Sequence, residues 1–327
     1  MIRRYIIDFE VNYLVQDTFL VQKVELLQTK NNQDYLKFHL KDKTGEISAF
    51  LWSNQTKQPF TDYIRDIPEN SVVEVKGKVA EYNTILILHL TDIRKTDDFD
   101  FSELVKAIDT TLIFNEVKNY LVKIQDNNLC SLRDVFLSDS AFISSLLLAP
   151  AAKMRHGAYQ GGLIEHILDI MRFINCSMAL VRETGNMDLL IMGAFIHDIG
   201  KIKTYDLTTC EYTREGRLIG HLVLGFSLLQ LYIEKVDNFN LDLKDQLNHL
   251  LLSHHGSFEK GSVVRPLTLE ANILSSLDEL VANLRDVKEC VDVIKVDESP
   301  KFNKLLDRYL YNFRVKNNTR KIRLRKK

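Results

Sequence analysis

The segment Ala194-Phe195-Ile196-His197-Asp198-Ile199-Gly200-Lys201 places a histidine and an aspartate side by side in a stretch that reads as helix. Imidazole and carboxylate together are the ligand set of a hydrolytic metal centre, and a carboxylate can bridge two cations. Neighbouring residues on a helix point about 100° apart. His197 and Asp198 can therefore occupy adjacent positions of one metal cluster.

Other histidines and an aspartate stand around this pair in apolar stretches that also read as helix. His166 lies within Leu163–Leu168, and His254-His255 follow Leu250-Leu251-Leu252-Ser253. Burying so many polar groups is costly unless something binds them, and a metal does. The ordered set predicts a metal site built from His166, His197, Asp198, His221, His254, His255 and Asp278.

The remaining histidines and the cysteines are interpreted as structural. A lone histidine is usually a packed or solvated side chain, and this is the first interpretation for His39, His89, His156 and His249. The four cysteines are scattered without a C-x-x-C spacing. We expect them to be small core residues of a protein in a reducing cytoplasm, not zinc ligands or disulfides.

Length and composition are those of an ordinary globular protein. A chain of 327 residues predicts two domains, and its 45% hydrophobic and 27% charged residues are typical of a soluble protein. No apolar run approaches the length of a membrane span, and Met1-Ile2-Arg3-Arg4 leads into no signal-peptide core. We therefore expect a cytoplasmic protein that does not enter a membrane.

The charge is unevenly distributed along the chain. Residues 314–327 contain eight basic residues and no acid, so subtracting this +8 from the net charge of −1 leaves −9 for residues 1–313. Such a basic tail can add salt-sensitive phosphate contacts to a nucleic-acid complex. A disordered, solvated end is the equal alternative.

Residues 10–95 read as short strands separated by turns. Leu36, Phe38 and Leu40 alternate with polar residues, and 42–46 form a turn before a second alternating strand over 47–52. A helical connection around 58–67 precedes strands over 71–79 and 84–90. Five strands in this order predict a small all-β Greek-key barrel of the OB type.

Aromatic and basic residues of these strands are candidates for nucleic-acid binding, because bases stack on rings and basic side chains follow the phosphates. The candidates are Tyr35, Lys37, His39, Phe50, Trp52, Lys76 and Lys78. Alternation identifies two faces of a strand but not which one is wet, so Phe50 and Trp52 could equally fill the barrel interior. Residues 1–100 hold 13 basic and 16 acidic residues, so a binding face must be a local patch.

The rest of the chain reads as helical. Residues 97–155 pass from an acidic stretch into helices over 102–107, 115–123 and 141–148, and residues 160–313 are apolar at helical spacing. Gly161-Gly162 opens the helix that carries His166 and allows a close approach of chain or ligand. The predicted domains are the barrel (1–95), a helical connector (96–155), an all-α bundle around the metal cluster (156–313) and the basic tail (314–327).

The order His166, His197-Asp198, His221, His254-His255, Asp278 resembles the HD phosphohydrolase superfamily. The segments 158–166, 197–201, 220–221 and 253–256 resemble one branch of it closely, and 40–52 resemble nucleic-acid-binding OB folds. With both halves together, residues 1–313 resemble the YhaM-type 3′–5′ exoribonucleases.

This resemblance implies a two-metal phosphodiesterase. Asp198 would bridge two divalent cations, with His166, His197 and Asp278 on one and His221, His254 and His255 on the other. It also implies manganese and release of nucleoside 5′-monophosphates from the 3′ end of single-stranded RNA. Single-stranded DNA as a substrate and a homo-oligomer as the assembly stay open alternatives. Mixed nitrogen and oxygen ligands suit manganese but do not select it over iron, cobalt or zinc.

Two residues are candidates for catalysis, Asp198 and Lys201. Lys201 lies one helical turn after Asp198, so its ammonium group can reach the same pocket and stabilise developing charge. The alternative is that Lys201 is a surface lysine.

The chain departs from the family pattern at two places, and two other functions stay open. Ser275-Ser276 precede Leu277-Asp278 where a histidine is usual, and Arg155-His156-Gly157 stand before Ala158 where the family has a basic or histidine pair. Both changes leave the substrate range open. The alternatives are a nucleotidase or cyclic-nucleotide phosphodiesterase of the HD type, which leaves the barrel unexplained, and a DNA-binding replication accessory factor, which does not need the full ligand set.

Overall fold

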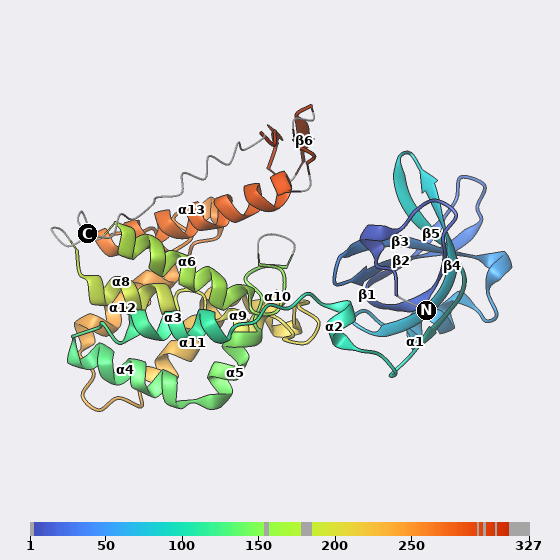
Figure 1. The fold of residues 1–327 in the computed structure, drawn as a ribbon. Helices are drawn as coiled ribbons and strands as arrows, with labels where there is room; N and C mark the ends of the chain where they lie inside the picture. Colours follow the sequence, from blue (N-terminus) through green and yellow to red (C-terminus); the bar gives the residue numbers. More distant parts are fainter. Residues whose placement is uncertain are drawn as a thin grey trace, which may run out of the picture.

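The computed structural model describes residues 3–153, 157–177, 185–292, 294–296, 299–304 and 306–313. The basic tail and the pair Arg155-His156 lie outside these residues. A β barrel forms one end of the molecule and a bundle of helices the other (Figure 1). This confirms the predicted multi-domain fold.

The barrel consists of five strands. They are β1 (Leu14–Gln28), β2 (Asp34–Asp42), β3 (Gly45–Trp52), β4 (Val72–Tyr82) and β5 (Ile85–Lys95). The barrel closes in the order β1-β2-β3-β5-β4, with β3 parallel to β5 and all other pairs antiparallel. The helix α1 (Phe60–Asp66) connects β3 to β4. The predicted OB barrel is therefore confirmed.

The alternation along β2 and β3 decides which side chains fill the barrel. Leu36, Phe38 and Leu40 are fully buried in its core together with Leu51. Ser48, Phe50 and Trp52, which alternate with the buried residues of β3, are partly exposed on the outer face. Phe50 and Trp52 therefore lie outside the barrel and do not fill its interior.

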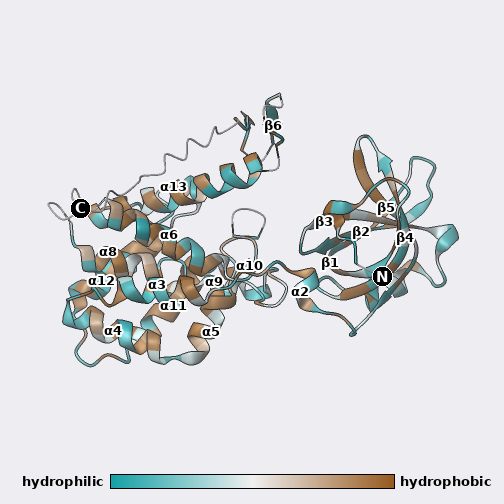
Figure 2. Ribbon diagram, viewed as in Figure 1, coloured by the Kyte–Doolittle hydropathy of each residue, from teal (hydrophilic) through white to brown (hydrophobic). Residues whose placement is uncertain are grey.

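The helical domain contains most of the remaining chain. Helix α2 (Phe101–Leu104) follows the barrel and packs against it. The helices of the domain itself are, among the described residues, α3 (Thr111–Leu121), α4 (Asn127–Ser138), α5 (Ser140–Leu148), α6 (Gly162–Cys176), α8 (Met187–Ile196), α9 (Lys201–Thr204), α10 (Arg214–Ile219), α11 (His221–Ile233), α12 (Leu241–Ser253) and α13 (Leu269–Asp292). Asp126, Asp139, Asn186 and Asn240 cap α4, α5, α8 and α12 by accepting a backbone N–H. Brown and teal segments alternate along α13, as expected for an amphipathic helix (Figure 2).

The segment expected to connect the two domains is helical, but much of it packs as part of the bundle. Val117 of α3, Leu132 of α4 and Leu146 of α5 are fully buried in the same hydrophobic core as Ile167 of α6 and Leu250 of α12. The chain therefore enters the bundle at about residue 111, and only α2 and its flanking residues lie between the two cores.

The C-terminal domain is not purely helical. A hairpin of β6 (Lys301–Asn303) and β7 (Arg308–Leu310) follows α13, and Leu306 and Leu310 pack against Ile294. Pro300, which directly precedes the hairpin, lacks the backbone N–H that a helix interior would need. The hairpin adds two short strands at the end of the predicted helical domain. In the part of the chain that is described, no helix is both long and apolar enough to cross a membrane.

Candidate metal centre

Seven predicted ligands converge inside the bundle, most of them from helix ends. His166 lies in α6 and Asp278 in α13, whereas His197 and His254 are the C-cap residues just after α8 and α12. Asp198 and His255 follow these ends directly, and His221 is the first residue of α11. The expectation that each ligand stands within a helix is corrected, because a turn after α8 and after α12 lets two successive side chains face one centre.

Asp198 lies between two groups of histidines. Its Oδ2 atom is 3.3 Å from Nε2 of His197 and 4.0 Å from Nε2 of His166. Its Oδ1 atom is 3.4 Å from Nε2 of His221 and 3.5 Å from Nε2 of His254. Each carboxylate oxygen thus faces a different set of nitrogen ligands, which is the arrangement of a bridging carboxylate.

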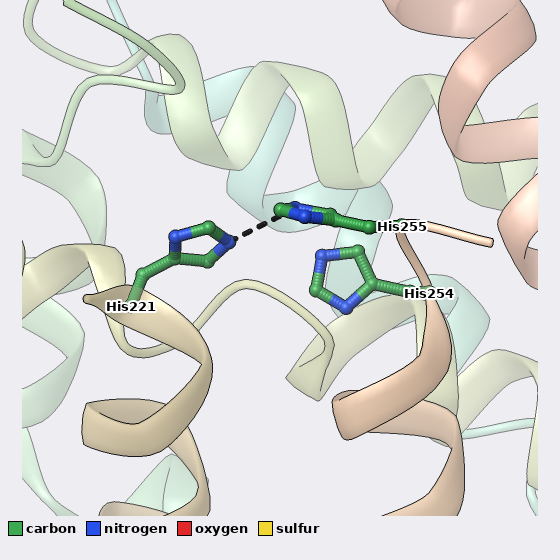
Figure 3. Close-up of side chains that lie close together, drawn as sticks. All are labelled: His221, His254 and His255. Carbon is green, nitrogen blue, oxygen red and sulfur yellow. Dashed lines mark hydrogen bonds between the residues drawn. The ribbon is translucent and has the colours of Figure 1, made fainter. Parts of the chain in front are cut away.

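Each side of Asp198 offers enough ligands for one cation. On the first side, Oδ1 of Asp278 lies 2.9 Å from Nε2 of His166, which in turn lies 3.4 Å from Nε2 of His197. On the second side, Nε2 of His221 and Nε2 of His255 are 3.1 Å apart, next to His254 (Figure 3). The two groups contain the nitrogen and oxygen donors that transition metals accept.

Hydrogen bonds to the backbone orient three of these rings. Nδ1 of His197 lies 2.9 Å from the carbonyl oxygen of Ala194, and Nδ1 of His254 lies 2.7 Å from that of Leu251. Nδ1 of His255 lies 3.0 Å from the carbonyl oxygen of Lys260. A ring that donates its Nδ1 proton there presents the lone pair of Nε2 to the centre, as metal-binding histidines do.

The protonation states also suit cation binding. Burial lowers the pKa of His221 to about 3 and that of His255 to about 4, so both rings are neutral at pH 7. Burial alone would raise the pKa of the Asp198 carboxyl, but Lys201 and His197 hold it well below its usual value. Burial would lower the pKa of His197, and the charge of Asp198 raises it. The centre therefore combines the neutral imidazoles of His221 and His255 with a buried anion, Asp198.

Two buried atoms of the centre lack a hydrogen-bond partner among the described residues. They are Oδ1 of Asp198 and Nε2 of His254. Their separation of 3.5 Å exceeds the usual hydrogen-bond distance. An unsatisfied buried carboxylate oxygen is costly, and a cation between the two atoms would remove that cost. The residues therefore fit a pair of divalent cations.

Lys201 faces the same centre. Its Nζ atom lies 2.5 Å from Oδ2 of Asp198, and its side chain is only 14% exposed. Lys201 is therefore not a surface lysine, which was the alternative interpretation of the sequence. Two cavities meet at Lys201, Ala151 and Ala152, one of about 350 Å³ and one of about 710 Å³. The smaller cavity includes Asp278 and Ser275, and the larger one includes His221.

On the barrel, three of the predicted aromatic residues form one cluster. The ring centroids of Tyr35 and Trp52 are 4.8 Å apart, and those of Tyr35 and Phe50 are 5.9 Å apart. His89, which we interpreted as an ordinary histidine, belongs to this cluster and accepts a hydrogen bond of 3.2 Å from Nε1 of Trp52. No signal in the sequence pairs His89 with Phe50, because β5 and β3 meet only in the closed barrel.

The predicted basic residues differ in their position relative to this cluster. Lys37 pairs with Phe50 across β2 and β3, and Lys78 pairs with His89 across β4 and β5. The structure places Lys76 opposite Asp92. Nε2 of His39 lies 3.1 Å from a carboxylate oxygen of Glu25. The outer face therefore presents a row Lys37–Phe50–His89–Lys78 to which Lys76 and His39 do not belong.

A glycine allows the second group of ligands to approach Asp198. A Cβ atom on Gly200 would lie 1.9 Å from the carbonyl oxygen of His221 and 2.5 Å from the backbone nitrogen of Gly225. We expect Gly200→Ala to push α11 away, lower the free energy of unfolding by about 1–3 kcal/mol and reduce the amount of metal bound per chain. Thermal melting and metal analysis of the purified variant measure both effects.

Gly45→Ala is the control for this substitution, because its Cβ atom would make an ordinary contact of 3.5 Å with Ile6. Wild-type melting and metal content in Gly200→Ala would show that the close approach of α11 is not needed.

Comparison with known proteins agrees with both halves of the chain. The model of the HD domain matches residues 163–283, and that of the OB-fold nucleic acid binding domain matches residues 20–96. The 3′-5′ exoribonuclease YhaM of Listeria monocytogenes serotype 4b is 30% identical over 318 residues, which cover 94% of this chain and 97% of that protein. The protein of the same name from Shouchella clausii is 28% identical over 293 residues, covering 86% and 88%. The chain belongs to the family of YhaM 3′-5′ exoribonucleases.

Proposed function

We propose that this protein is a metal-dependent 3′–5′ exoribonuclease that degrades single-stranded RNA to nucleoside 5′-monophosphates. The observation that carries this proposal is Asp198, whose two carboxylate oxygens each face a separate group of ligands. The HD domain implies dependence on a divalent metal, and the relatives are named exoribonucleases. We assign one cation to His166, His197, Asp198 and Asp278, and the other to Asp198, His221, His254 and His255.

The residues of the centre divide the work of phosphodiester hydrolysis. When bound, the divalent cations supply activation of the attacking water and neutralisation of phosphate charge. Asp198 fixes the spacing of the two ligand groups, and backbone hydrogen bonds hold the histidine rings in place. Water attacks the terminal phosphorus, the bond to the 3′ oxygen of the preceding nucleotide breaks, and that oxygen leaves with a proton. The ammonium group of Lys201 stabilises the negative charge that develops on the phosphate.

The barrel supplies the grip on the polymer in this proposal. Tyr35, Phe50, Trp52 and His89 line a cavity of about 360 Å³ on its outer face. Rings in such a cavity can stack on bases of any sequence, and the flanking Lys37 and Lys78 can contact phosphates. Because the relatives are named exoribonucleases, RNA is the first substrate to test and single-stranded DNA is the second.

We further propose manganese as the native metal and the cytoplasm as the location. The residues assigned to each position supply nitrogen and oxygen donors, which suit manganese as well as iron, cobalt and zinc. All four cysteines are free thiols, which agrees with a reducing compartment.

A degradation assay with two labels tests the proposed direction and product. We expect 5′-labelled single-stranded RNA to shorten gradually with manganese present, while 3′-labelled RNA releases labelled nucleoside 5′-monophosphate at once. A DNA oligomer of the same sequence compares the two kinds of substrate. Adding manganese, cobalt, iron or zinc back after chelator treatment compares the metals. Products with a 3′-phosphate, or internal cuts at early times, would rule out the proposal.

A further inference from the structure

The larger cavity beside the metal centre carries aromatic and cationic groups that hydrolysis itself does not need. Tyr205 and Tyr212 line its wall with ring centroids 4.9 Å apart. The guanidinium carbon of Arg217 and Nζ of Lys153 each lie 5.9 Å from the centroid of the Tyr212 ring. Tyr205 is buried, whereas Tyr212 is partly exposed and therefore accessible from the cavity.

Local structure fixes this wall in position. Residues 205 and 212 form a β-bridge, and Oδ1 of Asp206 accepts hydrogen bonds from the backbone N–H groups of Thr208 (2.9 Å) and Thr209 (2.8 Å). Thr213 caps α10 by accepting from the backbone N–H of Gly216. Loop 205–213 and the helix α10 that it leads into therefore present Tyr212 and Arg217 in one defined arrangement, which is what a binding site requires.

The same loop contacts the barrel. Cys210 is buried in a small apolar cluster with Leu20 and Val72 of the barrel. Next to it, Glu211 is buried and lies 2.5 Å from Nζ of Lys153 and 3.4 Å from Nε2 of Gln22 on β1. In Figure 1, α10 lies on the side of the bundle that is turned toward the barrel. The cavity thus stands between the barrel and the metal centre.

The outer face of β2 leads from the aromatic cluster to this loop. Tyr35, Lys37, His39 and Lys41 alternate with buried residues, so they share that face. Lys41 pairs with Leu20, which packs against Cys210. Six residues of extended strand span about 20 Å. A single strand that stacks on the aromatic cluster can therefore follow a basic row to the mouth of the cavity.

We propose that the larger cavity is a nucleotide subsite for the residue on the 5′ side of the scissile phosphate, the nucleotide that becomes the new 3′ end. Tyr212 stacks on its base, and Arg217 and Lys153 contact the phosphates on the path from the barrel. The smaller cavity, lined by Asp278, then receives the nucleotide that is released. This inference rests on the proposed function, because it assumes a single-stranded polymer cut near its 3′ end.

Binding measured without metal tests the subsite separately from hydrolysis. The probe is a short 5′-fluorescein-labelled single-stranded RNA titrated in the presence of EDTA. We expect Tyr212→Ala to weaken binding about tenfold, whereas Tyr212→Phe retains the ring and stays within about twofold of wild type. Arg217→Ala should weaken binding and reduce its dependence on salt. Leu218→Ala is the matched control, because Leu218 is the exposed neighbour of Arg217 and does not line the cavity.

A crosslinking experiment assigns the position along the strand. RNA with 5-iodouridine at the penultimate nucleotide, irradiated in EDTA, should crosslink to Tyr212, and the same group at the terminal nucleotide should not. Thermal melting shows whether Tyr212→Ala is folded. If it is not, the RNA binding of Tyr212→Phe and Arg217→Ala decides whether the subsite exists.

The two proposals fail in different ways. If the wild type does not degrade RNA but the subsite variants lose binding, the exonuclease proposal falls, and the cavity is a binding site for single-stranded RNA without a role in cleavage. If the wild type degrades RNA while Tyr212→Ala and Arg217→Ala bind it like the wild type, the subsite proposal is overturned. A crosslink of the penultimate nucleotide outside residues 151–153 and 201–221, the segments that line the cavity, also overturns it.

Discussion

Replacing Asp198 by asparagine should abolish the hydrolysis of RNA and remove bound metal. The substitution keeps the size of the side chain but removes the charge that both groups of histidines face at 3.3–3.5 Å. Because the amide offers only one oxygen acceptor, it cannot serve both groups at once. We expect the turnover number to fall by at least about a thousandfold, as for the loss of a central electrostatic group in an active site.

Metal analysis and a single-turnover assay measure this effect. Asp245→Asn is a matched control, because Asp245 is an exposed aspartate on α12, the helix that ends at His254. A wild-type circular dichroism spectrum separates loss of the site from loss of the fold. Full metal content with wild-type turnover in Asp198→Asn would contradict the two-metal assignment.

The fold could be predicted largely from patterns that act over a few residues. The alternation of Leu36, Phe38 and Leu40 predicted a strand with one buried face, and the structure buries all three. Which face of β3 is wet could not be predicted, because it depends on closure of the barrel through the β3–β5 pair. Helices such as α5 were predicted, but their place in the bundle core depends on contacts with α6 that local spacing does not encode.

The candidate metal centre was predicted from residue order, because each ligand type occurs in an apolar context that would otherwise be costly. The geometry of the centre could not be predicted in this way. Each carboxylate oxygen of Asp198 faces a different group of ligands only because of where α8 and α12 end and α11 begins. His89 and Tyr212 carried no signal of their own. His89 becomes a candidate through Phe50 and Trp52, which are distant in the sequence, and Tyr212 becomes one through Lys153 together with the nearer Tyr205 and Arg217.

Removing two rings of the barrel cluster should weaken the grip on long RNA without impairing the chemistry. Tyr35 and Trp52 contact each other at 4.8 Å between ring centroids on the outer face, so Tyr35→Ala/Trp52→Ala removes a stacking platform while the buried core of β2 and β3 stays intact. Stacking of a base on one ring is worth about 1–3 kcal/mol. Loss of two such contacts should raise KM for long single-stranded RNA about 30-fold or more.

The contrast between two substrates identifies the cause of this change. Hydrolysis of bis-p-nitrophenyl phosphate depends on the metal centre and has no strand to hold, so its rate should stay within about twofold of wild type in the double variant. The control is Tyr309→Ala, which removes an exposed aromatic ring from the β6–β7 hairpin that follows α13 in the chain. An unchanged KM for long RNA in the folded double variant would mean that the cluster is not the grip. Equal losses on both substrates would instead mean that the barrel acts by supporting the bundle, since a small diester has no base to stack.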